Sequence, residues 1–342
     1  MTNITHLLFL ITLLSGTLIS ISSNSWFSAW MGLEINLLSF IPLMTSPKNI
    51  LSTEASLKYF LVQALASIIF LFSTTYMQIF SDSLLIINTF FISLISSTLL
   101  LKMGAAPFHF WFPGTMEGLS WTNGFILLTW QKIAPLMLLS YLIKMSTFIS
   151  LIIIISVIIG SLGGLNQTSL RKLLAYSSIN HLGWMVAAMF CGENLWELYF
   201  TIYTILTLSL IFMFSTFQIF HINQNFISLT FNPSLKLLLY LTLLSLGGLP
   251  PFFGFLPKWM VIQNLISLNA LFTVIVMVTM TLITLFYYLR LSFSAFLLSY
   301  LQPKWINHTQ VTLNPLNMTL MIFSASISTL GLFLSTIMFN FL

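Results

Sequence analysis

The sequence predicts an all-α polytopic membrane protein with about 11 transmembrane helices. Its 342 residues are 58% hydrophobic and only 5% charged, and the mean hydropathy is +1.01. A soluble domain carries about 25% charged residues, so this chain has too little charge to cover its surface in water. The apolar residues also form runs of about 20, the length that crosses a bilayer as a helix. Lipid is therefore the expected solvent.

Eleven apolar spans follow when the chain is divided at its polar, proline and glycine clusters. The span at 4–22 precedes the first basic residue, Lys48, so it lacks the charged flank of a signal or transit peptide and is expected to be a retained helix. The clearest linkers, 46–56, 221–234 and 301–315, are too short for a further domain. We expect one transmembrane domain, 1–342. Its expected spans are 4–22, 25–43, 55–79, 84–118, 123–143, 147–166, 171–190, 195–220, 235–265, 270–299 and 316–340.

Two of these spans, near 84–118 and 235–265, are interrupted by glycine and proline. The first break reads GAAP from Gly104, with Pro113 beyond it, and the second reads GGLP from Gly247, with Pro257 beyond it. The offset is 143 residues for the first glycine and the first proline, and 144 for the later proline. The second broken span lies five spans after the first, so the two run in opposite directions, as antiporter-like inverted repeats require. A helix break exposes backbone groups that attract water and charge.

The basic residues predict an orientation. An odd number of spans puts the termini on opposite sides, and the side away from the N-terminus carries only Lys144, with Asp82, Glu193 and Glu197. The N-terminal side carries seven basic residues and therefore faces the negative compartment, such as a cytoplasm or a mitochondrial matrix. Those seven are Lys48, Lys58, Arg171, Lys172, Lys236, Arg290 and Lys304.

Several kinds of chemistry are not expected in this chain. Its single cysteine, Cys191, cannot form an internal disulfide, and the chain has no CxxC pair. The five histidines lack ligand spacing, which argues against a metal site. No GxGxxG or P-loop motif is present. We expect no redox cofactor, nucleotide or metal in this chain.

Three lysines, Lys102, Lys132 and Lys258, fall inside the spans. A lysine near the bilayer centre costs about 2.5–3.5 kcal/mol on insertion scales, which favours a role in moving ions or protons. Lys132 lies too deep to reach an interface, so its structural alternative is an ion pair. Lys102, at the first break, has the alternative of reaching the interface with its flexible stem. Lys258 has the alternative of an interface lysine beside Trp259.

One acidic and two histidine side chains complete the candidate site. Glu34 lies well inside the second span, where a nearby lysine would keep both groups charged and isolation would leave a neutral, hydrogen-bonded glutamate. His109 and His181 are candidate proton relays because histidine titrates near neutral pH. Their structural alternative is a hydrogen-bonded core residue.

Six segments of the chain carry a resemblance to a known family. They are NSWFSAWMGLEINLLSFIPL, STEASLKYFL, LLLKMGAAPFHFWFP, LTWQKIAPL, GGLNQTSLRKLLAYSSINHLGWM and LSLGGLPPFFGFLPKW. These segments resemble the subunit 2 family of mitochondrial NADH:ubiquinone oxidoreductase, respiratory complex I, in its short animal, arthropod-like form, and the resemblance covers nearly the whole chain. More broadly, the chain is similar to the antiporter-like subunits that complex I shares with multisubunit cation/proton antiporters.

The resemblance implies roles for four residues. The family's glutamate–lysine pair matches Glu34 and Lys102, its central lysine matches Lys132, and the lysine of its second broken helix matches Lys258. Family members usually have fourteen helices, and the animal form lacks the first three. The implied location is the mitochondrial inner membrane, with the N-terminus in the matrix and the C-terminus in the intermembrane space.

The function expected from residues and resemblance together is proton translocation in the membrane arm of complex I. NADH, FMN, iron–sulfur clusters and ubiquinone would be bound by other subunits. The expected partners are neighbouring antiporter-like and small membrane subunits and membrane lipids, with no nucleic acid. Two alternatives remain at this point: a subunit of a cation/proton antiporter, and a structural scaffold whose buried charges are only ion pairs.

Overall fold

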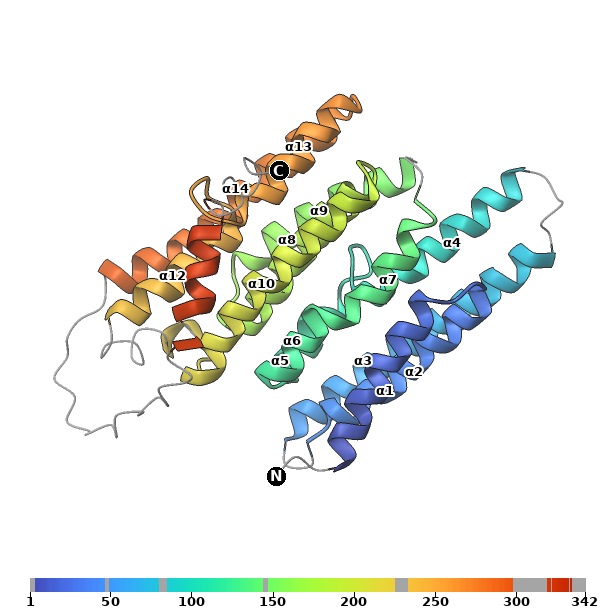
Figure 1. Cartoon of the computed structure of the whole chain (residues 1–342), viewed down its shortest axis with the longest axis horizontal. Coiled ribbons are helices and arrows are strands. Elements are labelled where there is room, and N and C mark those ends of the chain that lie inside the picture. The colour runs from blue at the N-terminus through green and yellow to red at the C-terminus, as the bar shows by residue number, and fades with distance from the viewer. Residues whose placement is uncertain are drawn as a thin grey trace. The chain divides into compact units, whose positions relative to one another are not determined.

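A computed structural model describes residues 4–46, 49–79, 85–143, 147–224, 233–297, 319–320, 322–331 and 333. These residues are helical, as predicted, and form no strand beyond a single β-bridge between Ser169 and His221 (Figure 1). Six helices of the described part are long and apolar enough to cross a membrane. Shorter apolar helices accompany them. The fold class is therefore that of a polytopic helical membrane protein.

The chain divides into two compact units, Met1–Ile159 and Gly160–Leu342. The prediction of one domain over 1–342 stays a prediction. In the first unit, α1 packs along α2, α2 along α3, and α3 against α4 and α5, while α7 packs against α4 and α6 (Figure 1). The helices of this unit are α1 Ile4–Ile21, α2 Trp26–Met44, α3 Ile50–Ile79, α4 Leu85–Met103, α5 Trp111–Gly118, α6 Trp121–Leu128 and α7 Trp130–Ser140. The unit boundary falls inside α8, Thr147–Gly164.

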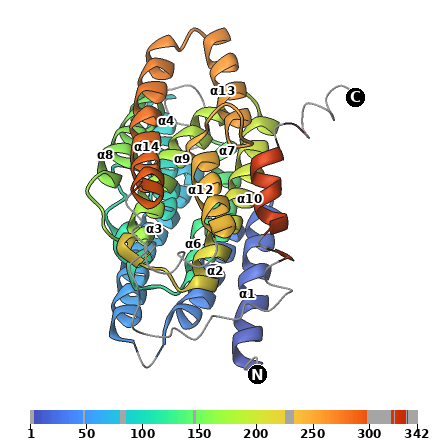
Figure 2. The same cartoon turned by 90° about the vertical axis from the view of Figure 1, so that its left-hand side faces the viewer.

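The second unit is built around α9 and α10. Every residue of α9 from Ser177 to Met189 is buried, and α10, α13 and α14 all contact this helix. Figure 2 shows α12 beside α10, in agreement with the packing of α12 on α10 and α14. The helices are α9 Leu170–Met189, α10 Glu193–Phe217, α12 Pro233–Gly247, α13 Phe255–Ser267 and α14 Leu271–Leu297, followed by the short apolar helix Ile322–Gly331.

Most predicted spans coincide with these helices to within a few residues, but α3 begins earlier than predicted. The prediction placed 46–56 in a linker and started the span at 55, whereas α3 starts at Ile50. Asn49 explains the difference, because its Oδ1 accepts from the Leu51 N–H at 3.1 Å and its carbonyl accepts from the Ser52 N–H at 3.1 Å. A side-chain oxygen that satisfies a first-turn N–H is a helix start signal.

The fifth predicted span, 123–143, is also corrected. The structure breaks it at Thr129 into α6 and α7. The Thr129 hydroxyl donates to the Phe125 carbonyl at 2.7 Å, a contact that bends helices. The Lys132 N–H then donates to the Thr129 carbonyl, three residues back, at 3.1 Å. A third broken span therefore joins the two that were predicted.

Some predicted features lie outside the described residues. These are most of the span 316–340, the linker at 301–315, part of the linker at 221–234, and the charged residues Lys48, Asp82, Lys144 and Lys304.

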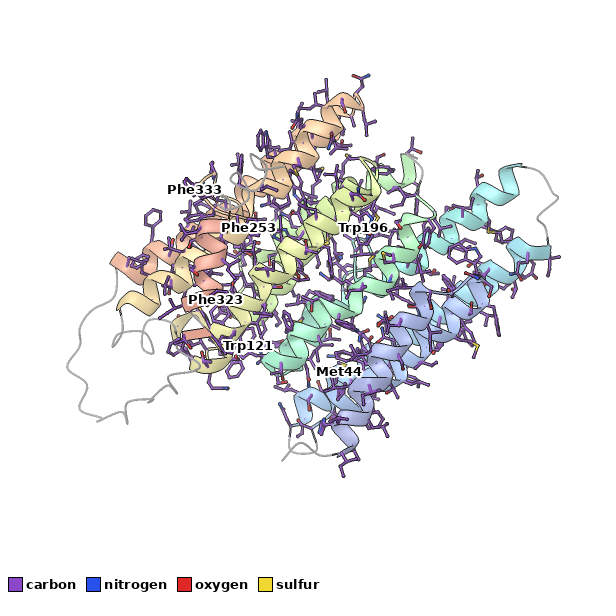
Figure 3. The ribbon with its side chains drawn as sticks, in the orientation of Figure 1. Met44, Trp121, Trp196, Phe253, Phe323 and Phe333 are labelled. Carbon is purple, nitrogen blue, oxygen red and sulfur yellow. The ribbon has the colours of Figure 1, made fainter. Side chains whose placement is uncertain are left out.

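The helix surfaces are apolar, as a lipid-facing protein requires. Carbon dominates the side chains drawn along the helices in Figure 3. Large apolar side chains such as Leu18, Leu65, Ile275 and Phe286 are exposed. In a bilayer such residues face lipid tails or neighbouring apolar chains, which adds no cost. The polar groups of interest are instead buried.

Candidate functional site

The first helix break is closed by a glycine cap. Gly104 has a φ of +74°, and it follows the last residue of α4. Its N–H donates to the Leu101 carbonyl at 3.1 Å, and the Ala105 N–H donates to the Leu100 carbonyl at 3.0 Å. This is the Schellman pair of hydrogen bonds, which ends a helix with a left-handed residue. Glycine adopts that conformation without the steric cost that a side chain brings.

Side chains satisfy the remaining carbonyls of this break. The Trp111 Nε1–H donates to the Leu101 carbonyl at 3.2 Å, and the Gln63 amide donates to the Lys102 carbonyl at 3.1 Å. Lys102 itself is buried in the last turn of α4. A cation in that position is stabilised by the negative end of the helix dipole. Lys102 is therefore buried at a helix break, as the sequence predicted.

The second break repeats the first. Gly248, with a φ of +82°, donates to the Ser245 carbonyl at 3.0 Å, and the Leu249 N–H donates to the Leu244 carbonyl at 3.5 Å. Gly248 is thus the counterpart of Gly104, one position later than the glycine chosen from the sequence. The helix after each break then carries proline as its third residue, in α5 and in α13.

Lys258 reaches back across the second break. It is buried in the first turn of α13, and its Nζ donates to the Gly247 carbonyl at 2.8 Å. That carbonyl belongs to the last residue of α12, where helix carbonyls lack intrahelical partners. The ammonium therefore neutralises the negative end of the preceding half-helix. The ammonium of Lys258 is therefore held inside the protein.

Lys132 is the most enclosed of the three lysines. Only 1% of its surface is exposed, and its Nζ lies 5.4 Å from the centre of the Phe112 ring. The break at Thr129 places it in the first turn of α7. Pro135, in the same helix, has no N–H to donate to the Gln131 carbonyl four residues earlier. The Gln131 carbonyl, next to Lys132, thus lacks its usual helical donor.

Glu34 lies on α2, close enough to Lys102 and Tyr59 for its charge to bear on both. Its pairing with Lys102 stays a prediction. Within the described residues, Glu34 and Lys102 form no ion pair of 4 Å or shorter, and the buried Glu34 Oε1 has no hydrogen-bond partner. The two groups therefore influence each other through space without a direct contact.

The two histidines occupy different surroundings. His109 is buried within the first break, with its Nδ1 3.3 Å from the Pro107 carbonyl. His181 is buried on α9, with its Nδ1 2.8 Å from the Tyr199 hydroxyl, and its ring lies 5.2 Å from that of Tyr203. Both are hydrogen-bonded core residues, and a relay role for them stays a prediction.

Sequence reasoning missed four neutral residues. Tyr59 donates to the Gln131 Oε1 at 3.2 Å, and the Gln131 Nε2 donates to the Asn36 Oδ1 at 3.0 Å. Gln63 holds the Lys102 carbonyl. Their signal in the sequence is a polar side chain inside an apolar span, which alone does not distinguish function from helix packing.

The predicted residues are distributed over the two units. The first unit contains Glu34, Lys102, His109 and Lys132, and the second contains Lys258 and His181. Across the described part of the chain, no three His, Cys, Asp or Glu side chains are placed to hold a metal ion.

The described residues thus form a polytopic helical membrane protein with buried lysines at breaks in its helices. A family model described as NADH:quinone oxidoreductase/Mrp antiporter, TM matches residues 23–284. The chain belongs to this family.

Its relatives are more specific. A protein of Anopheles gambiae named NADH-ubiquinone oxidoreductase chain 2 is 59% identical over 308 residues, 90% of each chain. The protein of the same name from Aedes aegypti is 56% identical over 341 residues, 99% of each chain. Among solved structures, a chain of respiratory complex I from Thermus thermophilus matches with a TM-score of 0.86 and 24% identity, over 97% of this chain and 79% of that one. The last match supports the fold.

Proposed function

We propose that this chain is a proton-translocating subunit of the membrane arm of NADH:ubiquinone oxidoreductase. The shared family and the naming of relatives at 56–59% identity support this assignment. The chain contributes to the enzyme without a redox centre of its own. NADH, FMN, the iron–sulfur clusters and ubiquinone are bound by other subunits under this proposal.

The contact between Lys258 and the Gly247 carbonyl is the observation that carries the proton role. It pairs a buried ammonium with an oxygen freed by a helix break, at 2.8 Å. Such a site can hold a proton inside the membrane, because the freed carbonyl offsets part of the cost of burying the charge. Lys102 occupies the matching break of the first unit.

The proposed cycle begins at Glu34. A carboxylate near a lysine stabilises its ammonium form, so a change in the position or charge of Glu34 alters the proton affinity of Lys102. Protons then pass along ordered water between Lys102, Lys132 and Lys258. Moving one charge against 100 mV requires about 2.3 kcal/mol, which a rearranged buried ion pair can supply.

The proposal includes a location and partners. The chain lies in the mitochondrial inner membrane, with its N-terminus in the matrix and its C-terminus in the intermembrane space, and the distribution of basic residues supports this orientation. Its neighbours are other membrane-arm subunits, including antiporter-like and small ones, and lipids. Charge changes caused by quinone reduction reach this subunit through those neighbours.

Native-gel sizing of the gently solubilised protein tests the assignment. We expect a large band that contains redox subunits by mass spectrometry and oxidises NADH within the gel. A small band of transporter subunits without NADH oxidation would refute the assignment in favour of a cation/proton antiporter.

A further inference from the structure

A buried chain of neutral hydrogen-bonding side chains links three helices of the first unit. The Tyr59 hydroxyl, on α3, donates to Gln131 on α7 at 3.2 Å, and Gln131 donates to Asn36 on α2 at 3.0 Å. The exposed fractions of Tyr59, Gln131 and Asn36 are 3%, 9% and 3%. Buried side-chain networks of this kind fix the relative positions of the helices that carry them.

Two residues connect this hydrogen-bonded series to the segments that carry Lys132 and Lys102. Gln131 directly precedes Lys132 in the first turn of α7. Gln63 lies one helical turn after Tyr59 on the same face of α3, and it donates to the Lys102 carbonyl at 3.1 Å. One face of α3 therefore holds both the residue next to Lys132, through Tyr59, and the backbone of Lys102, through Gln63.

The charge of Glu34 acts on the same face. Glu34 interacts electrostatically with Lys102 and with Tyr59, and its buried Oε1 has no hydrogen-bond partner. Asn36, at the other end of the hydrogen-bonded series, lies two residues from Glu34 on α2. A change in the charge or position of Glu34 can therefore weaken the bonds that hold Gln131.

The first turn of α7 is a segment that such a change can move. It begins at the break at Thr129, where the regular helical hydrogen bonds are interrupted. The side chain of Lys132 contacts the Phe112 ring, which belongs to the helix after the first break. A loosened Gln131 therefore changes the position of its neighbour Lys132.

We propose that Tyr59, Gln131 and Asn36 are positioning residues that transmit the charge state of Glu34 and Lys102 to Lys132. They transfer no proton themselves. This coupling rests on the proposed function, since it concerns how the charge state of Lys102 affects the position of Lys132.

Tyr59→Phe isolates the hydroxyl. The Tyr59 ring packs edge-on against Phe40 at 5.4 Å and Trp111 at 5.8 Å, contacts that a phenylalanine retains. Tyr76→Phe, on the more exposed part of the same helix, is the matched control.

Glu34→Asp is the second substitution of the cycle. It keeps the carboxylate and moves it by one methylene, so the variant complex should retain enough activity for the effect of a further substitution to be measured. Gln131→Leu removes the acceptor of the Tyr59–Gln131 hydrogen bond. It provides an independent test if the Tyr59→Phe complex does not assemble.

The experiment is a double-mutant cycle on the assembled complex in sealed vesicles, with proton uptake measured per NADH oxidised. We expect Tyr59→Phe to lower proton uptake per NADH about two- to tenfold, the range for one hydrogen bond. The loss in Tyr59→Phe with Glu34→Asp should be smaller than the product of the single losses, because both act through one link.

Two results would overturn the link: wild-type uptake in Tyr59→Phe, or losses that multiply in the double variant, as for a purely structural hydrogen bond. Lys132→Met, measured in parallel, separates this failure from that of the proposed function. If Lys132→Met lowers uptake and the cycle shows no coupling, only the link is wrong. If Lys132→Met leaves uptake unchanged, the proton role itself is wrong.

Discussion

At the residue scale, two of the buried lysines lie at the ends of half-helices, where the helix dipole favours a cation. Lys102 is stabilised from within its own last helical turn, and Lys258 from across a break. The sequence placed both lysines beside glycine and proline in an apolar run but left an interface position open for each. It could not predict the Gly247 carbonyl as the partner of Lys258, since that contact depends on how the chain turns between α12 and α13.

Gly248 tests this explanation directly. A Cβ at this position would lie 2.8 Å from the Lys258 Nζ, and the φ of +82° is unfavourable for alanine. We expect Gly248→Ala to destabilise the second unit by about 1–2 kcal/mol, the cost of a left-handed alanine, and to displace the ammonium from the Gly247 carbonyl. Thermal unfolding of the purified complex and proton uptake per NADH measure the two effects.

Gly114→Ala is the matched control. Gly114 lies in the helix that follows the first break, and a Cβ there would have no heavy atom within 4 Å. The control should keep wild-type stability and proton uptake. Equal behaviour of the two alanine variants would contradict the role given to Gly248.

The polar residues that the sequence did not single out have a common physical reason. Asn36, Tyr59, Gln63 and Gln131 carry no charge, so burial costs them less than it costs a lysine and makes them less conspicuous. Only tertiary structure brings residues as far apart as Gln131 and Asn36 within 3.0 Å. Glu34 and the lysines stood out because a charge in an apolar span is costly.

At the scale of the helix, glycine and proline predicted two breaks and missed a third. The breaks after α4 and α12 have left-handed glycines, each with a proline two or three residues later, and this spacing signals a break in the sequence. The joint between α6 and α7 depends on Thr129, whose hydroxyl competes for a backbone carbonyl, and threonine is common in regular transmembrane helices. The early start of α3 was missed for a similar reason, since Asn49 caps the helix inside a polar linker.

The break at Thr129 leads to a prediction for α7. Without the hydroxyl, Thr129→Ala should allow α6 and α7 to merge into a more regular helix, in which the N–H groups of Trp130 and Gln131 gain helical acceptors. Hydrogen exchange at these two amides should slow, and proton uptake per NADH should fall because Lys132 changes its direction. Hydrogen-exchange mass spectrometry of the assembled complex measures the first effect.

Thr129→Ser keeps the hydroxyl and should retain both the break and the proton uptake. The proposed cause of the break would be wrong if exchange at Trp130 and Gln131 were the same in the alanine and serine variants.

At the scale of the whole molecule, composition alone predicted the membrane class, and the family match over residues 23–284 agrees with it. Charge is almost excluded from the chain, so each remaining charge is informative. The division into a first unit with Glu34, Lys102 and Lys132 and a second with Lys258 could not be read from hydropathy. Hydropathy reports which segments are apolar, and it does not report which of them pack together.

The central claim is that buried lysines of this chain carry protons for the complex, and Lys132→Met tests it most directly. Methionine keeps the length and apolar stem of the buried side chain and removes its charge. Lys58→Met, an exposed lysine on α3, is the matched control. The measurement is the number of protons translocated per electron by the assembled complex. We expect the ratio to fall in Lys132→Met and to stay at the wild-type value in Lys58→Met; a wild-type ratio in both would contradict the claim.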